Sequence, residues 1–151
     1  MDALSLLKDD HNKVKKMLRE LESTTERGVK TREDLFSKVK HELTVHEAIE
    51  EEILYPALKE HPKTKDIALE AYEEHHVVDT VMAEIEGVAY EDETWGAKFK
   101  VMKENLEHHI EEEEGEMFKQ ARQVLDRDEL NQLGETMAIR KQELMGQAPA
   151  A

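Results

Sequence analysis

Residues 46–55 read HEAIEEEILY, and 63 residues later residues 109–118 read HIEEEEGEMF. Both segments carry a histidine, a glutamate four positions on, and a second glutamate directly after it. Each is preceded by a segment of one design, DDHNKV at residues 9–14 and EEHHVV at residues 73–78. Imidazole and carboxylate groups are costly to bury without a partner, so a repeat that served only a core would not keep them. The duplication therefore points to a pocket that uses these groups, and four imidazoles with two carboxylates suit a dinuclear metal site.

Composition limits the classes of protein to which this chain can belong. Its 151 residues are 38% hydrophobic and 38% charged, with only 5% aromatic, which is typical of one helical domain with charged outer faces. The net charge of −15 would repel a nucleic acid or an anionic membrane, so we expect neither as a partner. The sequence has no cysteine, which excludes disulfides, thiolate metal sites and iron–sulfur clusters.

The expected location is the cytoplasm. No apolar run approaches the length of a membrane span. The first residues, MDALSLLKDD, lack the basic start and long apolar stretch of a signal peptide.

Helical periodicity and breaker residues predict an all-α chain. We expect helices at about residues 3–26, 32–60, 64–86, 94–125 and 128–145, followed by a frayed tail at 146–151. Short connections make neighbouring helices antiparallel, which predicts an up-down-up-down four-helix bundle over residues 1–126. Residues 127–151 should add a short C-terminal helix and tail, packed on or extending from the same domain, as a cover for the bundle end or a dimer contact.

Three local signals refine these helices. Asp2 is a candidate N-cap for the first helix. Thr31 and Asp34 resemble a capping box at the start of the second helix. Pro56 lies inside the last turns of that helix, where a kink is expected.

The apolar stripes decide which polar residues face inward. His11 fills the one gap in the stripe of the first helix, between Leu7 and Val14. Corresponding interruptions give the full set of predicted metal ligands: His11, His46, Glu50, His75, His109 and Glu113. A register error of one residue would exchange His75 for His76 or His109 for His108, and periodicity favours His75 and His109. We interpret the flanking acids Glu51, Glu52, Glu111 and Glu114 as solvated.

At these residues the chain resembles the hemerythrin-like family, also called HHE cation-binding domains, over about residues 3–125. The matching elements are DDH ending at His11, the segment H46EAIEEEILYP, EEH ending at His75, and the segment H109IEEEEGEMF. The resemblance implies two non-haem irons joined by an oxo or hydroxo bridge, with Glu50 and Glu113 bridging them. His11 and His46 would then bind one iron, and His75 and His109 the other.

One position departs from the oxygen-carrying members of that family, which have a second histidine one turn before the equivalent of His75. Ala71 stands there, so one iron is a ligand short unless water, Tyr72 or Asp79 substitutes. Tyr72 and Asp79 are accordingly candidates for supporting or weakly binding groups. An open coordination position favours peroxide, O2 or NO reacting at the metal over simple oxygen carriage.

Three functions remain open from the sequence. The first is a di-iron protein that reacts with peroxide, O2 or NO, including a catalase-like or peroxidase-like enzyme, with an unknown reductase as a further partner. The second is a module that senses or stores O2 or iron without turnover, and would signal through a separate partner. The third is a structural bundle that holds zinc or no metal.

Overall fold

The computed structural model describes residues 1–147, which form helices joined by short turns, with no strand among them. In chain order the elements are α1 (Ala3–Glu22), α2 (Val29–Ile49), η1 (Glu50–Leu54), α3 (Tyr55–Lys59), α4 (Pro62–Glu86), α5 (Trp95–Glu112), η2 (Glu113–Met117), α6 (Phe118–Val124) and α7 (Arg127–Met145), where η marks a π-helix. The predicted all-α class is confirmed. The last part of the predicted tail, residues 148–151, lies outside the described residues. No described helix has the length and apolar character needed to cross a membrane.

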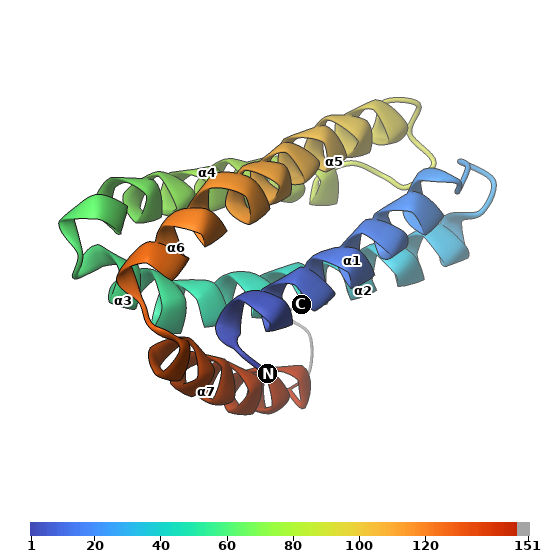
Figure 1. Cartoon of the computed structure of the whole chain (residues 1–151). Coiled ribbons are helices and arrows are strands. Elements are labelled where there is room, and N and C mark those ends of the chain that lie inside the picture. Colours follow the sequence, from blue (N-terminus) through green and yellow to red (C-terminus); the bar gives the residue numbers. More distant parts are fainter. Residues whose placement is uncertain (148–151) are drawn as a thin grey trace.

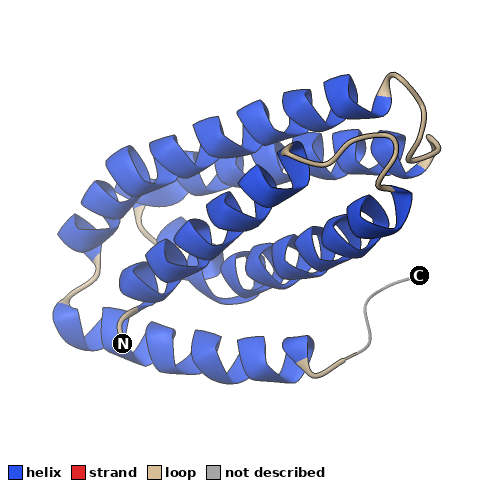
Figure 2. Ribbon diagram, turned by 90° about the vertical axis from the view of Figure 1, so that its right-hand side faces the viewer, coloured by secondary structure: helices blue, strands red, loops and turns tan. Residues whose placement is uncertain are grey.

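Two helix pairs form the body of the molecule (Figure 1). α1 packs against α2, α4 packs against α5, and the pairs meet through contacts of α1 with α5 and of α3 with α4. α2, η1 and α3 follow one another along one long segment, as do α5, η2 and α6. Figure 2 shows the described chain as long helices joined by loops. The molecule thus has four long helical segments and the separate helix α7.

The core is divided into two apolar clusters by a layer of buried polar residues. In α1, Leu7 belongs to one cluster and Val14 to the other, with buried His11 between them. The same change occurs at a buried histidine in α2 and α4. Along α5 and η2 it occurs between Ile110 and Met117, with buried Glu113 between them. Burial of apolar side chains on both sides of this layer stabilises the bundle. The buried polar groups of the layer cost free energy unless they pair with one another or with a bound ion.

The helix starts agree only in part with the sequence signals. The Asp2 side chain accepts a hydrogen bond from the Ser5 backbone N–H at 2.8 Å, so the predicted N-cap of α1 is confirmed. The predicted capping box at Thr31 is wrong, because α2 already begins at Val29 after Gly28. Asp34 instead accepts a hydrogen bond from Lys30 on the helix surface.

The irregularity predicted at Pro56 lies in the π-helix η1 just before it. Proline cannot be the necessary cause of such a turn, because η2 lies at the equivalent place in the second half and is followed by Lys119 at the position of Pro56. Pro56 instead occupies the first turn of α3, where its missing N–H costs least.

α7 lies across the outer surface of α1 and α2 (Figure 1). Its start has a capping box, in which Asp126 accepts from the Glu129 backbone N–H and the Glu129 side chain accepts from the Asp126 N–H. Gly134 allows the close approach, because a Cβ there would collide with the backbone of Met1 and Asp2. α7 is therefore a cover on one side of the molecule.

Candidate metal centre

Six buried side chains converge in the polar layer between the two apolar clusters. They are His11 of α1, His46 of α2, Glu50 of η1, His75 of α4, His109 of α5 and Glu113 of η2. On one carboxylate, Glu50 Oε1 lies 3.0 Å from His46 Nε2 and 3.3 Å from His75 Nε2. Glu50 therefore connects the first half of the chain to the second.

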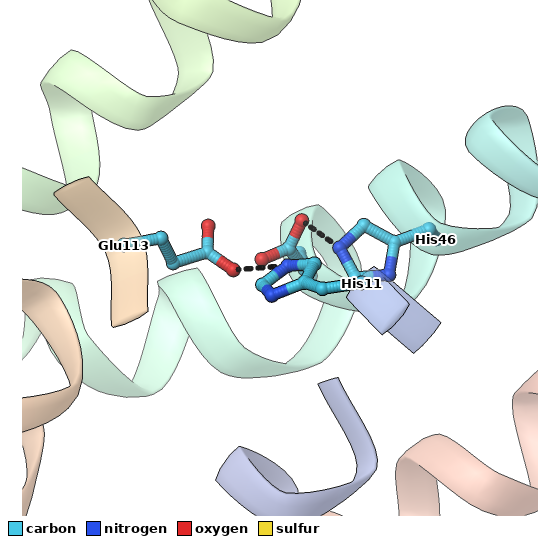
Figure 3. A group of neighbouring side chains, drawn as sticks. His11, His46 and Glu113 are labelled. Carbon is cyan, nitrogen blue, oxygen red and sulfur yellow. Dashed lines mark ion pairs between the residues drawn. The ribbon is translucent and has the colours of Figure 1, made fainter. Parts of the chain in front are cut away.

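The other carboxylate, Glu113, makes the equivalent contacts. Its Oε1 lies 3.2 Å from His11 Nε2, and its Oε2 lies 3.2 Å from His109 Nε2. Figure 3 shows His11, His46 and Glu113 pointing toward one another from three separate segments. Ligand atoms within 4.8 Å of one another define two groups, His11, His46, Glu50 and Glu113, and Glu50, His75, His109 and Glu113. The two groups share both carboxylates, an arrangement that would suit two neighbouring cations.

The π-helices determine which of the residues that follow Glu50 and Glu113 in the chain face this centre. The Tyr55 N–H donates to the Glu50 carbonyl, and the Phe118 N–H donates to the Glu113 carbonyl, so each turn spans one residue more than an α-helical turn. Because of this extra residue, the side chains of the following helix face inward one position later in the sequence than a regular α-helix would place them. Sequence periodicity predicts Ile53 and Ala57 inward, but the fully buried residues are Leu54 and Leu58.

The shift also turns Tyr55 into the centre. Its hydroxyl donates to Glu113 Oε2 at 3.0 Å and lies 3.3 Å from His75 Nε2. Sequence reasoning missed Tyr55, although it lies only five residues after the predicted ligand Glu50. Only the extra residue in η1 places it on the same face as Glu50.

A second ring of carboxylates contacts the outer nitrogens of the histidines. Four Nδ1 atoms are involved: His11 at 2.7 Å from Glu114, His46 at 3.2 Å from Asp10, His75 at 2.9 Å from Glu51 and His109 at 3.1 Å from Glu74. An Nδ1–H that donates to a carboxylate leaves the Nε2 lone pair directed at the centre. The prediction that Glu51 and Glu114 are merely solvated is therefore wrong, since each orients a histidine of another helix.

Charge balance in the centre favours protons on His46, His75 and His109 when no cation is bound. Burial opposes the charge of His46, but nearby Glu50 and the hydrogen bond with Asp10 outweigh it and hold the pKa of His46 well above its usual value. Burial likewise opposes the charge of His75 and His109, yet contact with the carboxylates raises the pKa of His75 to about 9 and of His109 to about 10. A bound cation would replace these protons.

The donor atoms fit a metal pair. Among residues 1–147, five buried atoms at the centre make no aligned hydrogen bond: His11 Nε2, Glu50 Oε1 and Oε2, His109 Nε2 and Glu113 Oε1. Unpaired polar atoms are costly in a protein interior, so their convergence needs a partner. Imidazole nitrogen and carboxylate oxygen without thiolate suit iron, manganese or zinc.

Comparison with known proteins agrees with this chemistry. The family model of the hemerythrin HHE cation binding domain matches residues 2–121. The chain belongs to the hemerythrin HHE family. A solved HHE cation binding domain-containing protein from Mycobacterium kansasii is similar, with a TM-score of 0.88 and 27% identity over 97% of this chain and 88% of that one. A DNA nickase of Nostoc sp. is 24% identical over 155 residues, and the HHE chain described here spans only 43% of that relative.

The histidines next to the predicted ligands of this HHE protein face away from the centre. His76 is exposed, and His108 lies on the surface, where its Nε2 is 3.0 Å from Glu112. The structure thus brings His75 and His109 to the centre, as the apolar stripes predict.

Neither candidate for the missing ligand reaches the centre. The Tyr72 hydroxyl donates to the backbone carbonyl of Glu51 at 3.1 Å, and its ring packs edge-on against Tyr55 with centroids 5.2 Å apart. Asp79 is exposed and lies beside buried Glu47, outside both four-residue groups. Tyr72 therefore packs against Tyr55 and does not contact the centre. The hydroxyl that lies beside His75 comes from Tyr55 instead.

Proposed function

We propose that this HHE protein holds two non-haem irons at the six-residue centre and uses them to bind or react with peroxide, O2 or NO. The carrying observation is that two histidine pairs share two carboxylates, and that three of the four oxygens of these carboxylates lack aligned partners. We also infer that the four long segments alternate in direction as an antiparallel up-down-up-down bundle over residues 1–126. Residues 127–151 would then belong to the same domain.

In this proposal Glu50 and Glu113 bridge the metals, with His11 and His46 on one ion and His75 and His109 on the other. Such a pair would supply redox chemistry toward small oxidants. The apolar clusters on both sides of the centre limit its contact with water, and the outer carboxylates fix the imidazoles.

Tyr55 gives the two ions different surroundings. Its hydroxyl is a fifth protein donor beside His75 and can give a hydrogen bond or a proton at its oxygen. On the other side, the ring of Phe118 stacks on His11 at 6.2 Å and offers no donor atom. We infer that a small ligand binds on the His11 side, where the protein leaves coordination positions open.

The first test is iron content per chain together with the visible spectrum, before and after addition of hydrogen peroxide. Two irons with ferric bands and oxygen evolved from peroxide support a catalase-like reaction. Two irons without peroxide turnover point to O2 or NO binding, or to sensing. A colourless, iron-free protein overturns the proposal and leaves a zinc-bound or metal-free bundle.

Matched variants separate the centre from the rest of the protein. His46→Ala and Glu113→Ala should abolish bound iron and activity while helix content changes little, because His46 belongs to one four-residue group and Glu113 to both. His108→Ala is the control, since it removes an exposed histidine beside His109. Retention of both irons in His46→Ala and Glu113→Ala would contradict the assignment.

The Nostoc relative raises DNA nicking as a second activity. We propose that this chain does not act on nucleic acid, because its net charge of −15 repels phosphate backbones. Conversion of supercoiled plasmid to the nicked form by metal-loaded protein, without peroxide or reductant, would overturn this view.

A further inference from the structure

A pocket of about 180 Å³ opens between α4 and the segment formed by α5 and η2. Its inner end is made by His109 and Glu113, which are only 5% and 2% exposed. Among the described residues, His109 Nε2 and Glu113 Oε1 make no aligned hydrogen bond. The pocket is therefore lined at its buried end by two of the candidate metal ligands, each of which has an unpartnered atom.

The rim of this pocket is acidic. Four glutamates line it: Glu70, Glu74, Glu112 and Glu116. Carboxylate oxygens of Glu70, Glu74 and Glu112 lie within 4.8 Å of one another, and no lysine or arginine lines the pocket. Like charges held this close repel one another, so the rim attracts a cation.

The internal repeat supplies a comparison for this rim. The residues equivalent to Glu70, Glu112 and Glu116 in the first half are Leu6, Ile49 and Ile53. Leu6 and Ile49 are buried and Ile53 is partly buried, on the side that α7 covers. The acidic residues thus replace apolar ones only where the centre is open to solvent.

Ala71 opens the pocket toward the centre. Its equivalent in the first half is Leu7, which is fully buried, whereas Ala71 lines the pocket. Glu74 continues the path inward, because it both belongs to the rim cluster and contacts His109 Nδ1 at 3.1 Å. Carboxylates therefore extend without interruption from the surface to the donor atoms.

We infer that this pocket is the route by which divalent iron is loaded into the centre. Glu70 and Glu112 attract the hydrated cation, Glu74 holds it at the pocket, and His109 and Glu113 receive it. The inference rests on the proposed iron-binding function and adds the direction of loading to it.

The test is the rate of iron(II) uptake by apo-protein under anaerobic conditions, with bound iron measured at timed intervals. Glu70→Gln combined with Glu112→Gln should slow uptake by about tenfold at low salt, because electrostatic steering changes association rates by about 10–1,000-fold. The difference should shrink in about 0.5 M salt, and the final iron content should stay the same.

Glu73→Gln combined with Glu111→Gln is the matched control. It removes two exposed carboxylates from the same helices, but neither residue lines the pocket, so uptake should stay within about twofold of wild type. Ala71→Leu provides a second test, because it narrows the pocket as Leu7 does in the first half and leaves every rim charge in place. It should slow uptake at all salt concentrations.

The outcomes distinguish this inference from the proposed function. Equal uptake rates for wild type, the rim variant and Ala71→Leu, all reaching full iron content, would overturn the route and leave the iron centre standing. Equal slowing by the rim and control variants would reduce the effect to net charge and would also overturn it. A wild-type chain that binds no iron would remove the proposed function, and the route with it.

Discussion

The first half of the molecule, α1 to α3, and the second half, α4 to α6, carry equivalent candidate metal ligands in two different surroundings. In the first half, α7 packs over the outer surface, and Asp10 is 5% exposed with Lys141 of α7 as a partner. In the second half, the equivalent Glu74 has a side chain that is 28% exposed and lies at an acidic pocket. The repeat preserves the candidate metal ligands. The residues around them differ, so that the ligands of the first half are covered by α7 and those of the second half lie next to a pocket open to solvent.

The two halves also differ at one residue directly beside the centre. Tyr55 and Phe118 occupy equivalent places after the two π-helices, but only Tyr55 brings a polar atom to the histidines. An arrangement of identical donors thus becomes asymmetric through a single hydroxyl.

The largest expected effect is the pH dependence of the apo-protein, to which both halves contribute. The pKa of His75 is raised to about 9 and that of His109 to about 10, so the folded state keeps protons that the unfolded state loses above about 6.5. Their stabilisation is complete below about pH 6.5 and is lost as pH rises through about 9 and 10. Burial raises the pKa of Glu47 to about 9, which acts in the same direction.

Thermal unfolding should therefore show the apo-protein losing stability between about pH 7 and 10. The iron-loaded protein should change much less, because its imidazoles carry a metal in place of protons. Equal pH profiles for the two forms would contradict this charge balance.

The next effect concerns the outer carboxylates of the two halves. Asp10→Asn and Glu74→Gln should each weaken iron affinity by about 10–100-fold, because the histidine they orient loses its acceptor. Asp10→Asn should have the larger effect, since Asp10 is buried and also accepts from Lys141. Competition with a chelator measures the iron affinity of both variants. A larger loss of iron affinity for Glu74→Gln than for Asp10→Asn would contradict this prediction.

The covering of the first half can be broken at Gly134. Gly134→Ala should destabilise the protein by about 1–3 kcal/mol, because the new Cβ forces α7 away from the backbone at Met1. Gly96→Ala is the control, since a Cβ there meets open space within a helix. Chemical denaturation compares the two, and an unchanged midpoint for Gly134→Ala would show that α7 tolerates a looser fit.

The smallest effect comes from exchanging the two aromatic residues at the centre. Tyr55→Phe should cost the apo-protein about 1 kcal/mol through the lost hydrogen bond to Glu113, and should alter the visible spectrum of the iron-loaded protein. Phe118→Tyr is the reciprocal change and should bring a hydroxyl to the His11 side. Identical spectra for wild type and Tyr55→Phe would exclude Tyr55 as a donor to iron.

The sequence by itself determined the all-helical class and the histidines that lie inside. An α-helix places residues three and four apart on one face, so an apolar stripe selects His75 over His76 and His109 over His108 without knowledge of the neighbouring helices. The repeat likewise brought Glu50 and Glu113 into the same set, because the spacing to the preceding histidine is local.

Only the tertiary structure decided what surrounds that set. Each π-helix adds one residue to a turn, so the residues after it face a different direction from that expected for an α-helix. This change buries Tyr55 at the centre, while Tyr72 donates to the backbone of Glu51. A sequence pattern counted at a constant 3.6 residues per turn does not detect the added residue. Glu51 and Glu114 orient histidines on other helices, and α7 packs over α1 and α2 of the first half. These features depend on which surfaces meet in space, so they follow from packing between segments that are distant in the chain.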